Sequence, residues 1–115
     1  MQIITWDEME KEVVSETFNR RFVYGEKVML AQIELKKGCL VPLHRHENEQ
    51  ITYILEGALQ LEIEGKTVLL RQGQALVIPS NVPHSAVALE DTLDLDIFAP
   101  PRQDWINKTD AYLRK

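Results

Sequence analysis

Beyond Gly25, apolar residues recur at every second position in short runs, and Gly, Asn or Pro residues separate these runs. A period of two is the pattern of half-buried β-strands, and it is clearest where Leu59, Leu61 and Ile63 alternate with polar residues. Strands this short and this evenly spaced predict an antiparallel sandwich or barrel. Before Gly25, the run 20–24 is rich in aromatic and β-branched residues and predicts a first strand. The further predicted strands are 27–35, 50–55, 59–63, 67–70, 75–78, 85–89 and 93–98.

The two ends of the chain carry helical signals instead. Thr5, followed three residues later by Glu8, has the form of a helix-capping box and predicts a short helix over 6–14. The tail, 103–115, is polar with a few apolar residues and predicts a short helix packed on the outside. The sequence shows no repeat, linker or low-complexity segment, and we expect a single domain over 1–115.

Composition and charge narrow the classes of partner. The formal net charge of −5 and the pI near 5.2 argue against nucleic acid or an anionic membrane. A single cysteine, Cys39, cannot form an intrachain disulfide, which fits a reducing compartment. Since the sequence has neither a long apolar run nor a signal-peptide pattern, we expect a cytoplasmic protein.

The three histidines of the chain form the most specific pattern in it. His44 and His46 are two positions apart, and residues two apart in a strand point to the same face. Two imidazoles aimed at one point suit a divalent transition metal. His84 is alone in its segment, where a histidine is more often a surface or hydrogen-bonded core residue than a ligand.

Two segments of the chain resemble the two motifs of the cupin superfamily. The residues at the spacing of the first motif, G-x5-H-x-H-x3,4-E-x6-G, are Gly38, His44, His46, Gln50 and Gly57. The residues at the spacing of the second, G-x5-P-x-G-x2-H-x3-N, are Gly73, Pro79 and His84. The resemblance implies an all-β cupin fold, a double-stranded β-helix or jelly-roll barrel with short terminal helical segments. Motif 1 would span about 38–57 and motif 2 about 73–88. The resemblance also implies that His84 joins the other two histidines at a metal, although some cupins have lost theirs.

The sequence departs from the two motifs at three positions. Gln50 stands in place of glutamate, Asn81 in place of glycine, and Ala88 in place of the final asparagine. Asparagine tolerates positive φ better than most residues, so the turn at Asn81 can survive. The final asparagine is not a metal ligand in the family, so Ala88 leaves the ligand set intact.

The exchange at Gln50 changes the expected chemistry. Three neutral imidazoles and a neutral amide leave a metal ion its full positive charge, which suits a Lewis acid better than oxygen activation. Glu47 and Glu49 are alternative ligands, but their strand parity relative to the histidines is wrong unless a loop intervenes.

The last predicted strand, 93–98, has an ambiguous orientation. Leu93, Leu95 and Ile97 share one face, and Asp94, Asp96 and Phe98 share the other. In an isolated sheet the aspartates would face solvent. In a two-sheet barrel that also pairs with a second subunit, both faces can be covered, and Asp96 can point into the cavity.

A closer resemblance covers most of the chain. The segments 42–50, 78–84 and 96–102 are similar to the KdgF family, small cupins of pectin and alginate degradation that open the ring of 4,5-unsaturated monouronates. The resemblance places the family's metal ligands on His44, His46, Gln50 and His84. It places the catalytic residues on Asp96 and Arg102, and the substrate-binding residues on Phe98 and Arg102.

The resemblance implies a small-molecule sugar acid as substrate and one divalent transition metal ion as cofactor. An imidazole-rich site accepts zinc, nickel, iron, manganese or copper, so the sequence leaves the metal open. Arg102 has a second interpretation as a solvated charge after the Pro100–Pro101 turn. A non-catalytic sugar- or metabolite-binding cupin and a metal-dependent oxygenase are the alternative functions. We expect a homodimer, because exposed edge strands need protection.

Overall fold

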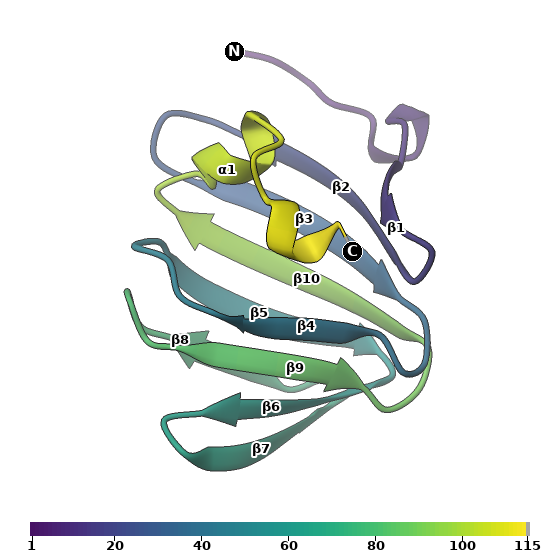
Figure 1. Ribbon diagram of the computed structural model, residues 1–115. Coiled ribbons are helices and arrows are strands. Elements are labelled where there is room, and N and C mark those ends of the chain that lie inside the picture. The colour runs from purple at the N-terminus through teal and green to yellow at the C-terminus, as the bar shows by residue number, and fades with distance from the viewer. Residues whose placement is uncertain (115) are drawn as a thin grey trace.

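The computed structural model describes residues 1–114, and in this part of the chain ten strands form two antiparallel sheets (Figure 1). The larger sheet has the order β1 (Glu12–Ser15), β2 (Phe18–Tyr24), β3 (Met29–Leu35), β10 (Thr92–Ala99), β5 (Glu49–Glu56) and β8 (Ala75–Ile78). The smaller sheet has the order β4 (Leu40–His44), β9 (His84–Ala88), β6 (Ala58–Ile63) and β7 (Lys66–Arg71). This arrangement confirms the predicted all-β architecture. Lys115 lies outside the described residues, so the predicted domain and tail helix are followed only to Arg114.

All eight predicted strands are present, with bounds shifted by at most two residues. The sequence pattern missed β4 because Pro42 interrupts it, and proline cannot donate to a strand ladder. β4 tolerates Pro42 because it is an edge strand of the smaller sheet, and its pairing with β9 is irregular between Val41 and His44.

The predicted N-terminal helix over 6–14 is wrong. Only a single 3-10 turn, η1 (Trp6–Glu8), is formed, and the side chain of Thr5 makes no capping hydrogen bond. A helix this short is marginal on its own. The β-branched pair Val13–Val14 instead extends into β1, whose backbone pairs with β2.

The hydrophobic core lies between the two sheets. The strands alternate, so that one face of each contributes buried aliphatic residues and the other faces outward. The buried members from the larger sheet include Met29, Ala31, Ile33, Leu35, Ile54 and Ile78, and those from the smaller sheet are Ala58, Leu59, Leu61, Leu70, Ala86 and Ala88.

β10 brings polar residues into this core. It lies inside the larger sheet, paired with β3 on one side and β5 on the other. Its inward face carries four residues that are each at most 4% exposed: Thr92, Asp94, Asp96 and Phe98. The solvent-facing interpretation of the two aspartates is therefore wrong, because the smaller sheet covers this face. The aliphatic residues between them point outward instead.

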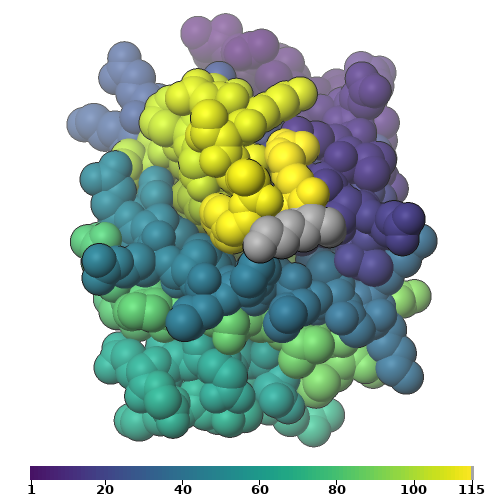
Figure 2. Space-filling view, in the orientation of Figure 1, coloured from purple at the N-terminus to yellow at the C-terminus, as the bar shows by residue number. Residues whose placement is uncertain are grey.

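The C-terminal segment closes one side of the barrel and does not pack loosely outside it. It contains α1 (Gln103–Ile106) and η2 (Ala111–Leu113), and Figure 2 shows it in yellow over the upper middle of the face in view. Trp105 and Leu113 are 3% and 7% exposed and belong to the core. The predicted external helix is thus corrected to two short turns that contribute to the interior.

A buried ionic cluster, the latch, fastens this segment to β1 and β2. The carboxylate of Asp110 is fully buried and accepts hydrogen bonds from Arg20 Nη1 at 2.7 Å and Arg114 Nε at 2.9 Å. Glu12 accepts from Arg20 Nε at 2.8 Å and Arg114 Nη2 at 2.7 Å. The latch holds the last turn against the strand that begins the larger sheet.

Two motif positions adopt the left-handed backbone conformation. Gly57 has φ of +93°, and a Cβ there would lie 2.5 Å from the backbone oxygen of Asp91. Asn81 has φ of 63°, which agrees with the expectation that asparagine preserves this turn. No helix within residues 1–114 is long and apolar enough to span a membrane.

Candidate metal centre

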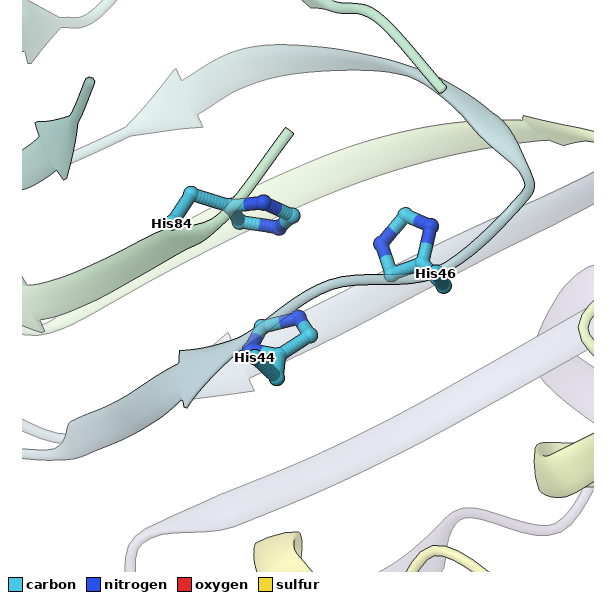
Figure 3. Close-up of side chains that lie close together, drawn as sticks. All are labelled: His44, His46 and His84. Carbon is cyan, nitrogen blue, oxygen red and sulfur yellow. The ribbon is translucent and has the colours of Figure 1, made fainter. Parts of the chain in front are cut away.

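The three histidines meet at one end of the smaller sheet. His44 ends β4, His84 begins β9, and the two residues are partners in the β4–β9 ladder. His46 lies two residues beyond β4, in the connection to β5, and Figure 3 shows its ring turned toward the other two. One ring nitrogen from each histidine lies within 4.8 Å of the others. The convergence therefore does not depend on all three residues lying in strands.

The backbone fixes the tautomer of each ring. The Nδ1 atoms of His44, His46 and His84 lie 2.7, 2.9 and 2.9 Å from a backbone carbonyl oxygen two residues away. A carbonyl oxygen only accepts hydrogen bonds, so each Nδ1 carries the hydrogen. Each Nε2 is then left with a free lone pair, which is the arrangement of metal-ligating histidines.

The histidines are also held in the neutral form. Burial lowers the pKa of His44 and His46 to about 4, and the positive charge of Arg102 acts in the same direction. Burial lowers the pKa of His84 as well. Neutral imidazole is the protonation state that binds a metal ion, so the site is poised for binding at neutral pH.

Gln50 supplies a fourth donor atom. It is the second residue of β5, it is 8% exposed, and its Oε1 lies 3.1 Å from Nε2 of His46. In the tautomer set by the backbone both atoms present lone pairs, an arrangement that suits a shared cation. Glu47 and Glu49 are exposed, so they do not take the place of Gln50. Three imidazole nitrogens and an amide oxygen fit a divalent transition metal.

Two buried hydrogen bonds orient the amide of Gln50. Its Nε2 donates to Thr52 Oγ1 at 2.8 Å, and Thr52 Oγ1 donates to Asp96 Oδ1 at 2.8 Å. The carboxylate of Asp96 accepts, so the hydroxyl of Thr52 points to it and accepts from the amide in turn. The amide oxygen therefore faces the histidines. Thr52 is 1% exposed, and no motif in the sequence marks it as a site residue.

Phe98 and Arg102 form the wall beside the histidines. The ring of Phe98 contacts that of His46 edge-on, with centroids 5.8 Å apart. The guanidinium of Arg102 lies 5.1 Å from the centroid of Phe98 and 4.9 Å from that of Trp105. Arg102 is 2% exposed, so the interpretation of it as a solvated charge is wrong.

Asp104 and Tyr112 hold Arg102 in place. Nε and Nη2 of Arg102 donate to the two carboxylate oxygens of Asp104 at 3.0 and 2.8 Å, and Nη2 also donates to the hydroxyl of Tyr112 at 2.5 Å. The ring of Tyr112 stacks on His44, with centroids 5.0 Å apart. Tyr112 was not identified from the sequence as a site residue, because only the fold brings the tail to β4.

One cavity between the sheets joins these groups. It is lined by His44, His84, Gln50, Asp94, Asp96 and Arg102. Its volume is about 50 Å³, which is room for a few water molecules. Tyr112 and Leu113 from the C-terminal segment also line it.

The fold and the histidine site together define the class of this protein. Residues 31–99 match the model of the cupin domain family, and the chain therefore belongs to the cupins. Within this class it is KdgF-like. It is 28% identical to the pectin degradation protein KdgF of Dickeya dadantii over 103 residues, 87% of this chain and 94% of that protein.

Solved structures agree with this assignment. The structure of KdgF from Halomonas sp. superposes with a TM-score of 0.84 at 33% identity, covering 90% of this chain and 99% of that one. An RmlC-like cupin from Shewanella frigidimarina superposes with a TM-score of 0.85 at 24% identity, covering 91% of this chain and 96% of that one. The second similarity concerns the fold alone.

Proposed function

We propose that this protein is a metal-dependent enzyme that opens the ring of 4,5-unsaturated monouronates from pectin or alginate breakdown. The metal would be held by His44, His46, Gln50 and His84. The observation that supports the proposal most directly is the hydrogen-bonded link from the ligand Gln50 through Thr52 to Asp96. Through that link a buried carboxylate lies near the three clustered histidines and Gln50, in a chain similar to KdgF over almost its full length.

Asp96 would transfer the proton that the reaction moves. Ring opening breaks the O–H bond of the anomeric hydroxyl and the bond between C1 and the ring oxygen, and it forms two carbonyl groups. The electron pair of the 4,5-double bond takes up a proton at C4, so the reaction is an isomerisation without oxidant or net water. Asp96 can accept the first proton and return it to C4. The metal ion would supply Lewis-acid stabilisation of the oxygen that gains charge.

Arg102 would hold the substrate carboxylate. Its Nε and Nη2 are bound to Asp104, and within residues 1–114 its Nη1 makes no hydrogen bond. A planar guanidinium fixed on one side presents its remaining donors in a defined direction, which suits a carboxylate. Phe98 would pack against the sugar ring, since its own ring lies next to both Arg102 and His46.

The direct test is incubation of purified protein with an unsaturated monouronate while the ultraviolet absorbance of the 4,5-double bond is followed. The wild-type protein should remove the absorbance faster than buffer does. Asp96→Asn should lower kcat by on the order of 10²–10⁴ with metal content unchanged. Asp7→Asn, which alters an aspartate that is 97% exposed, is the matched control and should leave the rate unchanged.

The same preparation separates the alternative functions. Saturable binding of the sugar without turnover would indicate a non-catalytic binding cupin. Oxygen consumption with iron or copper bound would indicate an oxygenase, although a site of four neutral ligands suits Lewis-acid chemistry better. The identity of the metal, to be settled by elemental analysis of the isolated protein, and the cytoplasmic location stay predictions.

A further inference from the structure

The carboxyl group of Asp94 has no role in the proposed reaction, yet it lies next to the site. Asp94 and Asp96 share the inward face of β10, each is 4% exposed, and both line the central cavity. The two residues are two positions apart on the same face of one strand, so their carboxyl groups are neighbours, and the negative charge of Asp96 acts on Asp94. Oδ1 of Asp94 is buried and has no hydrogen-bond partner among residues 1–114.

The surroundings of the two carboxyl groups differ in polarity. The strand partners of Asp94 are Ile33 on β3 and Ile54 on β5, which are 3% and 0% exposed. Asp96 instead faces Thr52, which donates to it at 2.8 Å, and lies near the positive charge of Arg102. One carboxyl group is therefore surrounded mainly by hydrocarbon, and the other has hydrogen-bond donors.

This asymmetry decides which group carries a proton. Two adjacent negative charges in an apolar interior are unfavourable, so one carboxyl group stays neutral. Burial raises the pKa of Asp94 well above its usual range, and the negative charge of Asp96 raises it further. Asp96 accepts a hydrogen bond from Thr52, whereas Oδ1 of Asp94 has no donor among residues 1–114, so Asp94 is the group expected to carry the proton.

We propose that Asp94 is a positioning residue whose protonated carboxyl group donates a hydrogen bond to Asp96 and fixes its orientation toward the metal centre. The inference rests on the proposed ring-opening function, for which Asp96 is the proton-transferring group. It adds a fourth residue to the hydrogen-bonded series of Gln50, Thr52 and Asp96. Gln50 donates to Thr52 and Thr52 donates to Asp96, and Asp94 would be the second donor to Asp96.

Two substitutions at Asp94 separate this role from that of an ionised catalytic group. In Asp94→Asn the amide can still donate to Asp96, so activity should stay within a few-fold of wild type. Asp94→Leu keeps the branched shape, with larger methyl groups in place of the oxygens, and has no donor. It should lower kcat by about 10- to 100-fold, with KM and metal content unchanged, because a hydrogen bond to a charged group is lost.

Infrared spectroscopy tests the protonation of Asp94 without any assay. The wild-type protein at neutral pH should show the carbonyl stretching band of a protonated carboxylic acid, and the band should be absent from Asp94→Asn. The exposed variant Asp7→Asn should keep it. This measurement decides the question even where the leucine variant does not fold.

The outcomes distinguish the inference from the function on which it rests. Absence of the band from wild type, or a loss of activity in Asp94→Asn as large as that in Asp96→Asn, would overturn the role of Asp94. A wild-type protein that shows the band but does not act on any unsaturated monouronate would contradict the proposed function and support the protonated Asp94.

Discussion

At the scale of single residues, the orientation of the proposed ligand Gln50 depends on a neighbour, Thr52, that is not itself a proposed ligand. The hydroxyl of Thr52 accepts a hydrogen bond from the amide of Gln50 and donates one to the carboxylate of Asp96. Thr52→Val keeps the side-chain shape but removes both bonds, so the amide is free to turn its NH₂ group toward the histidines. We expect metal affinity to fall about 10- to 100-fold, measured by competition with a chelating dye.

Thr67→Val is the matched control for this substitution. Thr67 also donates to a side-chain carboxylate at 2.8 Å, that of Glu62, but the pair is on the exposed surface of the smaller sheet. The metal affinity of Thr67→Val should equal that of the wild-type protein. Equal affinity in Thr52→Val as well would show that the orientation of Gln50 does not matter for metal binding.

The histidines give the metal-free protein a defined pH dependence. Burial lowers the pKa of His44 and His46 from 6.5 to about 4 in the folded state. The unfolded chain therefore takes up protons at a higher pH than the folded one, and stability falls as the pH drops from 6.5 to about 4. Thermal unfolding of the chelated protein across this range should show the decline. A double variant with glutamine at both positions should have a flatter profile, and equal profiles would contradict the assigned cause.

Sequence spacing identified the residues of the candidate site that belong to motifs, but not their supports. His44, His46 and His84 stand at fixed intervals, which a pattern can capture. Thr52 could have been suspected, because it has the same strand parity as Gln50, but threonine is common in strands for reasons of shape alone. For Asp94, strand alternation indicated which face of the strand it shares, but not what packs against that face. The smaller sheet that covers this face of β10 is a property of the fold.

At the scale of elements, strands were predictable where side-chain alternation was intact. β8 (Ala75–Ile78) was predicted to the residue, since turn residues bound it on both sides. β1 was mistaken for part of a helix, because capping chemistry is local whereas the β1–β2 pairing is not. Most strands were therefore predictable from local sequence, whereas the structure at the start of the chain depends on long-range strand pairing.

The latch is the element-scale feature with the clearest energetic consequence. Arg20 and Asp110 are both fully buried and lie 2.7 Å apart. Asp110→Asn removes one of the two carboxylates that pair with Arg20, and Glu12 is then its remaining ion-pair partner. Removing one partner of a buried ion pair is strongly destabilising, and we expect a loss of about 3 kcal/mol, measured by denaturant unfolding.

The exposed pair Arg21–Asp7 provides the control for the latch. Its atoms are 4.0 Å apart and Asp7 is 97% exposed, so Asp7→Asn should change stability by less than about 0.5 kcal/mol. A comparable effect of the two substitutions would mean that the buried geometry of the latch does not contribute. Because the latch positions the turn that carries Tyr112, Asp110→Asn should also loosen the packing of the Tyr112 ring on His44.

At the scale of the whole molecule, the outer face of the larger sheet is uncharged along one continuous row. Strand register places five aliphatic residues side by side across five strands, in the order Val23, Leu30, Ile97, Ile51 and Val77. Ile97, Ile51 and Val77 are 36%, 37% and 57% exposed. A row of this kind can meet its own copy across a two-fold axis, since an isologous interface needs only a self-complementary surface.

The predicted homodimer can be tested at the centre of this row. Ile97→Asp places a charge where a symmetric partner would bury it, and the loss of apolar contact and the cost of desolvation both oppose association. The variant should still fold, because Ile97 points away from the core, and it should sediment as a monomer where wild type sediments as a dimer. Leu43→Asp, at a 70% exposed position on the edge strand β4, is the control and should stay dimeric. A wild-type protein that is monomeric at high concentration would contradict the homodimer prediction. Dissociation of both variants would show that the interface is not confined to this aliphatic row.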